Sequence, residues 1–151
     1  MTRFLVLIAF VLVLQGVGYL LGTSFPADEW YASLEKPFFN PPSWLFGVVW
    51  PILYLLVAVA GWRVFTSDPQ IPGWGYWLGQ LAFNWAWTPV FFGLHLVFWG
   101  IWVIVGGLLL SIGFMVRTWP HDKLASLCFA PYVAWLSFAL LLNVSIWWLN
   151  A

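Results

Sequence analysis

Five long apolar stretches divide this chain, and each has about the length of a helix that crosses a membrane. They run over residues 4–22, 44–65, 74–94, 96–116 and 124–149. A spanning helix needs about 20 apolar residues. Only 7 % of the residues are charged, whereas a soluble domain carries about 25 %. We therefore predict an all-α membrane protein, with residues 1–151 forming a single domain that is a bundle of five transmembrane helices.

The first stretch has a competing interpretation as a secretory signal peptide. Arg3 precedes the apolar residues, and small residues follow at Gly16 and Gly18, as in a signal sequence. The apolar run nevertheless continues through Leu21, which makes it too long for a typical signal core. We expect a spanning helix here.

The basic residues predict how the chain is oriented in its membrane. In the five-span arrangement one side carries four of the five, which are Arg3, Arg63, Arg117 and Lys123, and the other side carries only Lys36. The positive-inside rule then places the N-terminus in the cytoplasm and the C-terminus outside. The one substantial loop, residues 23–43, is external in this arrangement.

Fourteen tryptophans are more than membrane anchoring requires. Those near the predicted helix ends suit the headgroup region, and they are Trp44, Trp74, Trp119, Trp147 and Trp148. A second set lies deeper, and it comprises Trp50, Trp85, Trp87 and Trp135. A deep indole N–H needs a polar partner. These residues either fill a membrane core or line a pocket.

The third stretch carries a polar face. Gln80, Asn84, Thr88 and Phe91 recur at spacings of four, four and three residues, which places them on one side of a helix. Amides are costly in hydrocarbon, so this face should point into the bundle. The residues either join helices to one another or bind a ligand, and the pattern does not choose.

Three predicted helices contain a proline, at Pro51, Pro89 and Pro131. Each proline removes a backbone hydrogen bond and favours a kink, which makes room for a cavity. Aromatic and polar residues share faces nearby: Trp50 with Tyr54, and Trp135 with Phe138, Leu142 and Asn143. Such stripes suit a flat, mostly apolar ligand with a few polar edges.

Two glycine pairs are spaced for close helix packing. Gly75 and Gly79 form one small-xxx-small pair, and Gly18 and Gly22 form another. Either pair permits a close crossing within the chain or a contact between two chains.

Catalytic and metal-binding patterns are sparse. The only histidines are His95, at a predicted turn, and His121, in a loop, so His95 is the single candidate for a haem ligand. The acidic residues all fall in loops or at helix ends, which disfavours a proton relay. We expect no metal site, no catalytic constellation and, without a basic run, no nucleic-acid partner.

Several motifs, in order along the chain, resemble a known family. They are Asp28-Glu29-Trp30-Tyr31, Leu34-Glu35-Lys36-Pro37, Pro41-Pro42-Ser43-Trp44, Trp50-Pro51-Ile52-Leu53-Tyr54, Gln80-Leu81-Ala82-Phe83-Asn84, Trp87-Thr88-Pro89, Pro131-Tyr132 and Leu142-Asn143. Together they resemble the tryptophan-rich sensory protein, or translocator protein, family, which is related to the peripheral benzodiazepine receptor.

The resemblance implies a five-helix bundle, usually a homodimer, that binds porphyrins such as protoporphyrin IX and haem under the first loop, with no cofactor required. Residues 23–43, which form this loop, are then expected to act as a lid over the ligand. The family's pocket positions correspond to Tyr31, Pro41, Trp50, Tyr54, Asn84, Trp87, Trp135, Leu142 and Asn143, and Phe138 lies on the same stripe. The family's dimer contact corresponds to Gly75 and Gly79.

The resemblance leaves three functions open. The first is a porphyrin-binding or stress-sensing protein that also accepts benzodiazepine-type ligands. The second is an enzyme that degrades porphyrin in light, with Trp50 and Trp135 as participants. The third is a transporter of porphyrin or lipid. The family's cholesterol pattern needs a tyrosine followed by a basic residue, and residues 144–151 contain neither. This counts against sterol transport and fits a member of the family in a bacterial cell membrane.

Overall fold

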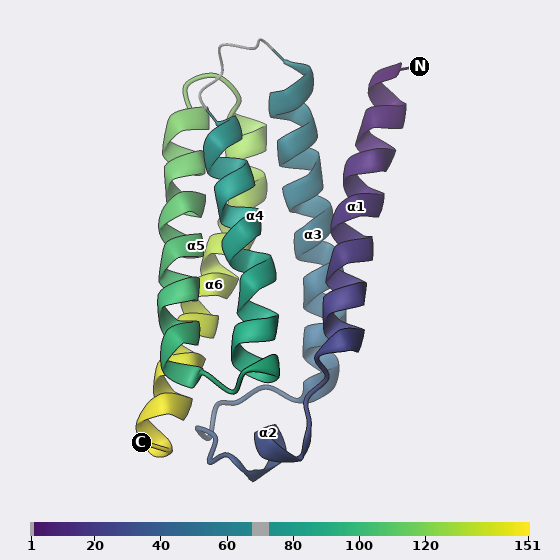
Figure 1. The fold of residues 1–151 in the computed structure, drawn as a ribbon. Coiled ribbons are helices and arrows are strands. Elements are labelled where there is room, and N and C mark those ends of the chain that lie inside the picture. The colour runs from purple at the N-terminus through teal and green to yellow at the C-terminus, as the bar shows by residue number, and fades with distance from the viewer. Residues whose placement is uncertain (1, 68–72) are drawn as a thin grey trace.

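The chain forms an all-α bundle, which we describe from a computed structural model covering residues 2–67 and 73–151 (Figure 1). Its elements are α1 (Thr2–Ser24), α2 (Glu29–Ser33), α3 (Ser43–Thr66), α4 (Trp74–Thr88), the π-helical turn η1 (Pro89–Gly93), α5 (Val97–Thr118) and α6 (Lys123–Leu149). The predicted break between the second and third stretches falls partly on residues 68–72, which lie outside the described residues.

The five predicted spans correspond to five rods of the bundle. Among the described residues, α1, α3, α5 and α6 are each long and apolar enough to cross a membrane. The fifth rod consists of α4 followed directly by η1. Each predicted boundary is within two residues of the observed one, except that the third stretch ends as a π turn. The fold is therefore that of a multi-pass membrane protein, as predicted.

The two ends of the bundle differ in charge. The N- and C-termini lie at opposite ends (Figure 1), as five spans require. The end with the N-terminus carries Arg3, Arg63, Arg117 and Lys123, as their places at helix ends dictate. Lys36 lies at the other end, in the segment between α1 and α3. Which end faces the cytoplasm stays a prediction from the positive-inside rule.

The internal prolines have two different outcomes. Helices α3 and α6 continue through Pro51 and Pro131. At Pro89 the helix instead widens into η1, where the Leu94 N–H donates to the Pro89 carbonyl, five residues back. The hairpin to α5 then turns at His95, whose φ is +57°. Phe91 and Phe92 thereby lie at the end of the bundle opposite the N-terminus.

The half of the bundle near the N-terminus is closely packed, and we call it the closed half. Trp77 lies against Gly61 of α3 so closely that a Cβ on Gly61 would overlap the indole. The Trp77 indole N–H donates to the Val57 carbonyl at 2.8 Å. Phe114 and Phe129 stack with 4.2 Å between ring centroids, and both are fully buried. The Trp77 contacts join α4 to α3, and the stacked phenylalanines join α5 to α6.

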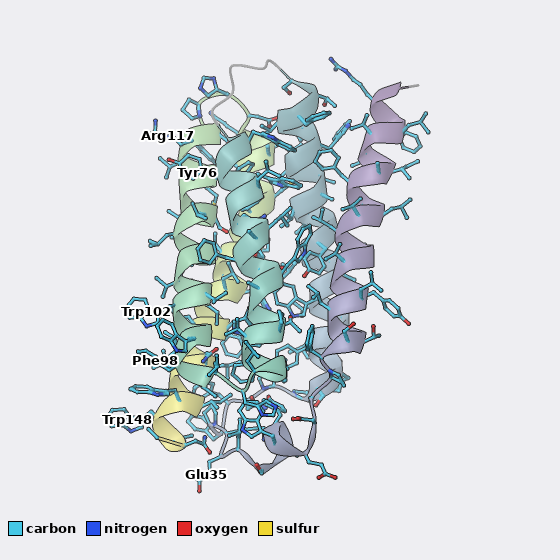
Figure 2. All side chains as sticks on the ribbon, viewed as in Figure 1. Glu35, Tyr76, Phe98, Trp102, Arg117 and Trp148 are labelled. Carbon is cyan, nitrogen blue, oxygen red and sulfur yellow. The ribbon has the colours of Figure 1, made fainter. Side chains whose placement is uncertain are left out.

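The predicted membrane anchors divide into two groups. Trp44, Trp119 and Trp148 are strongly exposed near helix ends, as expected for residues at the headgroups. Trp74 instead stacks on Trp77 with 5.0 Å between centroids and packs against the core. Figure 2 shows Phe98, Trp102 and Trp148 projecting outward near the C-terminus. Exposed aromatic residues at this depth fit an interfacial belt.

Candidate ligand cavity beneath the lid

The half of the bundle opposite the N-terminus is hollow, and we call it the lid half. It contains a partly open cavity of about 990 Å³. All five rods contribute to the wall, and residues 25–42, which we call the lid, cover its end. The predicted external loop is therefore not a free loop: it contains α2 and forms part of the cavity wall.

A chain of hydrogen bonds crosses the middle of the cavity wall. The Tyr54 hydroxyl donates to Asn84 Oδ1 at 2.8 Å, and Asn84 Nδ2 donates to the Tyr132 hydroxyl at 2.8 Å. The three residues come from α3, α4 and α6. This network gives the polar face of α4 a structural role in joining helices. All three residues also line the cavity, so the ligand-binding role left open by the sequence stays a prediction beside the structural one.

Asn143 forms a second polar junction closer to the lid. Its Oδ1 accepts the Trp87 indole N–H at 3.0 Å, and its Nδ2 donates to the Val97 carbonyl at 2.8 Å. The side chain is almost fully buried. A Cβ on Gly100 would lie 2.8 Å from Asn143 Oδ1, so the glycine leaves the space that the amide needs. The junction fixes the Trp87 ring in the wall.

Aromatic rings supply most of the remaining wall. Trp50 packs beside Tyr54 with 5.4 Å between centroids, and Trp135 contacts Phe46 at 5.8 Å. Trp87 stacks on Phe91 at 4.8 Å with a 22° angle between the rings. Extended ring faces with a few fixed polar groups suit a flat, mostly apolar ligand.

The lid is anchored to η1 and its following turn. Phe25 covers Gly93, where a Cβ would lie 2.7 Å from the ring. Trp30 stacks on His95 with 4.0 Å between centroids, and Asp28 Oδ2 lies 3.2 Å from His95 Nε2. Tyr31 meets Phe92 edge to face at 5.2 Å. The π turn thus presents the surface on which the lid rests.

Asn150, the residue that follows α6, holds the other side of the lid. Asn150 Oδ1 accepts the Glu35 backbone N–H at 3.0 Å, and Asn150 Nδ2 donates to the Glu35 carbonyl at 2.9 Å. One amide therefore pairs with both backbone groups of a residue 115 positions away.

Two side chains of the lid, Asp28 and Tyr31, have shifted pKa values. Asp28 caps α2 by accepting the Tyr31 N–H at 3.0 Å. This hydrogen bond, together with His95, lowers the pKa of the Asp28 carboxyl. Burial raises the pKa of the Tyr31 phenol, so Tyr31 stays neutral and presents a hydroxyl to the cavity that it lines.

Nine of the ten predicted ligand-binding residues line this one cavity. They are Tyr31, Pro41, Trp50, Tyr54, Asn84, Trp87, Trp135, Leu142 and Asn143. Phe138 is not in the wall: it packs behind Trp135 at 5.6 Å and against Phe39 at 6.4 Å. A ligand-binding role for the nine stays a prediction.

His95, which was considered above as a haem ligand, lies outside the cavity. It does not line the cavity, because its ring is stacked on Trp30 and its Nε2 lies beside Asp28. The described wall contains no histidine, cysteine or methionine. Within residues 2–67 and 73–151, no three His, Cys, Asp or Glu side chains gather as a metal site would require.

The glycine pairs behave differently from one another. A Cβ on Gly18 would overlap the Tyr54 ring, so this glycine serves a close crossing of α1 and α3 within the chain. Gly79 faces Leu110 of α5, which would lie 3.0 Å from a Cβ, whereas Gly75 borders open space. A homodimer through Gly75 and Gly79 stays a prediction.

Some wall residues were not found from the sequence. Gln15 is the one polar residue within the first apolar stretch, and its Nε2 donates to the Pro51 carbonyl at 2.8 Å. Its isolation in that stretch was an available signal. Ile104 and Gly107 of α5 line the cavity without any signal in their residue types.

Among residues 2–67 and 73–151, a few buried polar atoms have no hydrogen-bond partner. Both amide atoms of Gln80 and the Trp135 indole nitrogen belong to this group. Gln80 is fully buried and lies outside the cavity wall. Trp135 Nε1, by contrast, belongs to a residue of the wall and is a hydrogen-bond donor that no side chain satisfies.

Comparison with known proteins identifies relatives along almost the whole chain. Residues 7–149 match the TspO/MBR family. Protein CrtK of Rhodobacter capsulatus is 41 % identical over 133 residues, covering 85 % of this chain and 83 % of that protein. The tryptophan-rich protein TspO of Archaeoglobus fulgidus is 37 % identical, covering 96 % and 97 %. The human translocator protein is 35 % identical, covering 87 % and 82 %.

Proposed function

The chain belongs to the TspO/MBR family, and from that premise we propose that it binds a flat tetrapyrrole, such as protoporphyrin IX or haem, beneath its lid. The observation that carries the proposal is the lidded cavity of about 990 Å³. Ligand pockets typically measure about 300–1,000 Å³, and this one is at the large end of that range. Its size and its aromatic wall both suit a wide planar ring.

The aromatic wall accounts for the expected mode of binding. Trp50, Trp135 and Trp87 provide faces for stacking, and Asn84 retains an amide hydrogen for a polar edge. Flat aromatic drugs of the benzodiazepine type would use the same surfaces. A protein of this kind acts as a receptor or sensor of its ligand, with the lid on the outer side of a bacterial membrane.

The test is a titration of protoporphyrin IX followed by tryptophan fluorescence. We expect Trp135→Phe and Asn84→Ala each to weaken binding by roughly tenfold, which is the worth of one stacking or hydrogen-bonding contact. The matched control is Trp119→Phe, because Trp119 is exposed at the far end of the bundle. Unchanged affinity in both cavity variants would remove the cavity as the binding site.

A second candidate function is light-dependent degradation of the bound porphyrin. It is favoured by the presence of two oxidisable indoles, Trp50 and Trp135, in one cavity wall. In this reaction dioxygen is the oxidant: a methine carbon–carbon double bond breaks, and the two oxygen atoms become two carbonyl groups. Repeated turnover to a defined product, lost in Trp50→Phe, would support the enzyme. A single stoichiometric event would argue against it.

A further inference from the structure

The cavity has one charged side chain among its described lining residues, and that side chain is Lys36. The other polar members of the wall are neutral amides, hydroxyls and indoles. A lone ammonium in a mostly apolar wall exerts a strong attraction on an anion, because few other charges or waters screen it.

The Lys36 ammonium is held in place by the backbone of the lid. Its Nζ donates to the Tyr31 carbonyl at 2.6 Å, to the Leu34 carbonyl at 3.0 Å and, at 3.4 Å, to the Ala32 carbonyl. It also lies 4.5 Å from the centre of the Tyr31 ring. These contacts position the charge, but carbonyl dipoles and a ring face do not neutralise it.

The lid has three acidic residues, and none of them lines the cavity: Asp28, Glu29, which is exposed, and Glu35. Asp28 contacts His95 and the N-terminus of α2. Glu35 is fixed through its backbone to Asn150, and its side chain points away from the bundle into solvent (Figure 2). Among the described residues no carboxylate forms an ion pair with Lys36.

We propose that Lys36 binds a carboxylate of the ligand, so that among planar, apolar rings of the same kind the cavity prefers those that carry an acid group at one edge. The carboxylate would replace the Ala32 carbonyl, which is the most distant of the three acceptors. The inference rests on the proposed function and adds which ligands the cavity prefers. Recognition would thus depend on the acid group, since the described wall has no histidine, cysteine or methionine to bind a metal centre.

A purely structural role for Lys36 makes a different prediction. If the lysine only closes the C-terminal turn of α2, its loss loosens the lid and weakens every ligand equally. Protoporphyrin IX and its dimethyl ester separate the two roles, because they share the ring and differ in the acid groups.

The experiment measures the affinity of both compounds for the wild type, Lys36→Met and Lys36→Arg in lipid nanodiscs. We expect the wild type to bind the acid about tenfold more tightly than the ester, as for one charge-assisted hydrogen bond. Lys36→Met should weaken acid binding about tenfold and leave ester binding unchanged. Lys36→Arg, which keeps the charge, should retain a preference for the acid.

Two results would overturn the inference while leaving the proposed function intact. One is equal binding of acid and ester by the wild type. The other is an equal loss of affinity for both compounds in Lys36→Met, which would show that the lysine only stabilises the lid. If the wild type binds neither compound, the proposed function itself fails, and this outcome is distinct from the other two.

Discussion

The two halves of this bundle use the same kinds of residue for opposite purposes. In the closed half, Phe114 and Phe129 stack on each other and Trp77 fills the space beside Gly61. In the lid half, Phe91, Trp87 and Trp135 line an open volume of about 990 Å³. Aromatic content alone therefore does not distinguish a core from a ligand site. What differs is whether the packed rings fill the space between the helices or border a volume that they leave unfilled.

The largest effect should come from comparing two buried phenylalanines. Phe129 and Phe91 are 0 % and 1 % exposed, respectively, but Phe129 lies in the closed half and Phe91 borders the cavity. We expect Phe129→Ala to reduce the free energy of unfolding by about 3–5 kcal/mol without altering ligand affinity. Phe91→Ala should lower stability less and affinity by tenfold or more. Thermal unfolding and fluorescence titration measure the two. Equal effects on both properties would contradict the division into halves.

Glycines give the next contrast. Gly61→Ala adds a methyl group that overlaps the Trp77 ring, so we expect a loss of about 2 kcal/mol in the free energy of unfolding. Gly47→Ala is the control, because a Cβ on Gly47 has nothing within 4 Å although the residue lines the cavity. Its stability should change by less than about 1 kcal/mol. A comparable loss in both variants would show that the closed half is not the more tightly packed.

Two amides one helical turn apart on α4 should respond with opposite signs. Gln80 is buried without a protein partner, so Gln80→Leu should stabilise the bundle by about 1 kcal/mol. Asn84 joins Tyr54 and Tyr132, so Asn84→Leu should destabilise it by a similar amount. Chemical denaturation in detergent measures both. A loss of stability in Gln80→Leu would indicate that Gln80 has a partner beyond the protein's own side chains.

The smallest effect concerns pH and the two helix-capping aspartates. Asp28 caps α2 in the lid, and Asp122 caps α6 at the closed end, where it also pairs with Arg63 at 2.8 Å. The pKa of Asp28 is lowered chiefly by the Tyr31 N–H. Burial alone would raise the pKa of Asp122, but the Arg63 and Ala125 hydrogen bonds outweigh it and lower that pKa as well.

A lowered pKa fixes the direction of the pH dependence. Each carboxylate stabilises its helix cap above the pKa of the unfolded chain, near 4, and this contribution is lost as the pH falls through the lowered folded-state value. We expect the protection factors of the lid amides, which are corrected for the intrinsic pH dependence of hydrogen exchange, to fall in acid. Asp28→Asn should give faster exchange in the lid already at neutral pH, and Asp122→Asn should leave the lid unchanged. Identical lid exchange in the wild type and Asp28→Asn would contradict the assignment.

The sequence predicted the rods of the fold well, and the physical reason is the bilayer. Because every backbone group must be satisfied in hydrocarbon, apolar runs of this length have few alternatives to a helix. Trp50, Tyr54, Asn84 and Asn143 were identified as wall residues because polar and aromatic side chains stand out against such runs. Ile104 has no such contrast, so its place in the wall was not predictable.

The lid illustrates what a sequence pattern does not contain. Residues 23–43 were predicted as an external loop that acts as a lid, but the contacts that hold it were not predicted: they come from His95, Gly93 and Asn150. Each lies far along the chain and has no periodic signal. Phe138 was expected to share the wall with Trp135 because the two share a helix face, but it is absent from the wall and packs against Trp135 and Phe39 instead.

The π turn at Pro89–Gly93 has a consequence for how length variation is tolerated in this part of the chain. A π turn holds one residue more than an α-helical turn, and each residue rotates the following side chain by about 100°. Deleting one residue between Pro89 and Gly93 would let the helix continue as α. It would also turn His95 away from Trp30, leaving the apolar rod intact while removing the surface on which the lid rests. This deletion would leave the hydropathy of the segment almost unchanged. We therefore expect the shortened protein to insert into the membrane but to lose ligand binding.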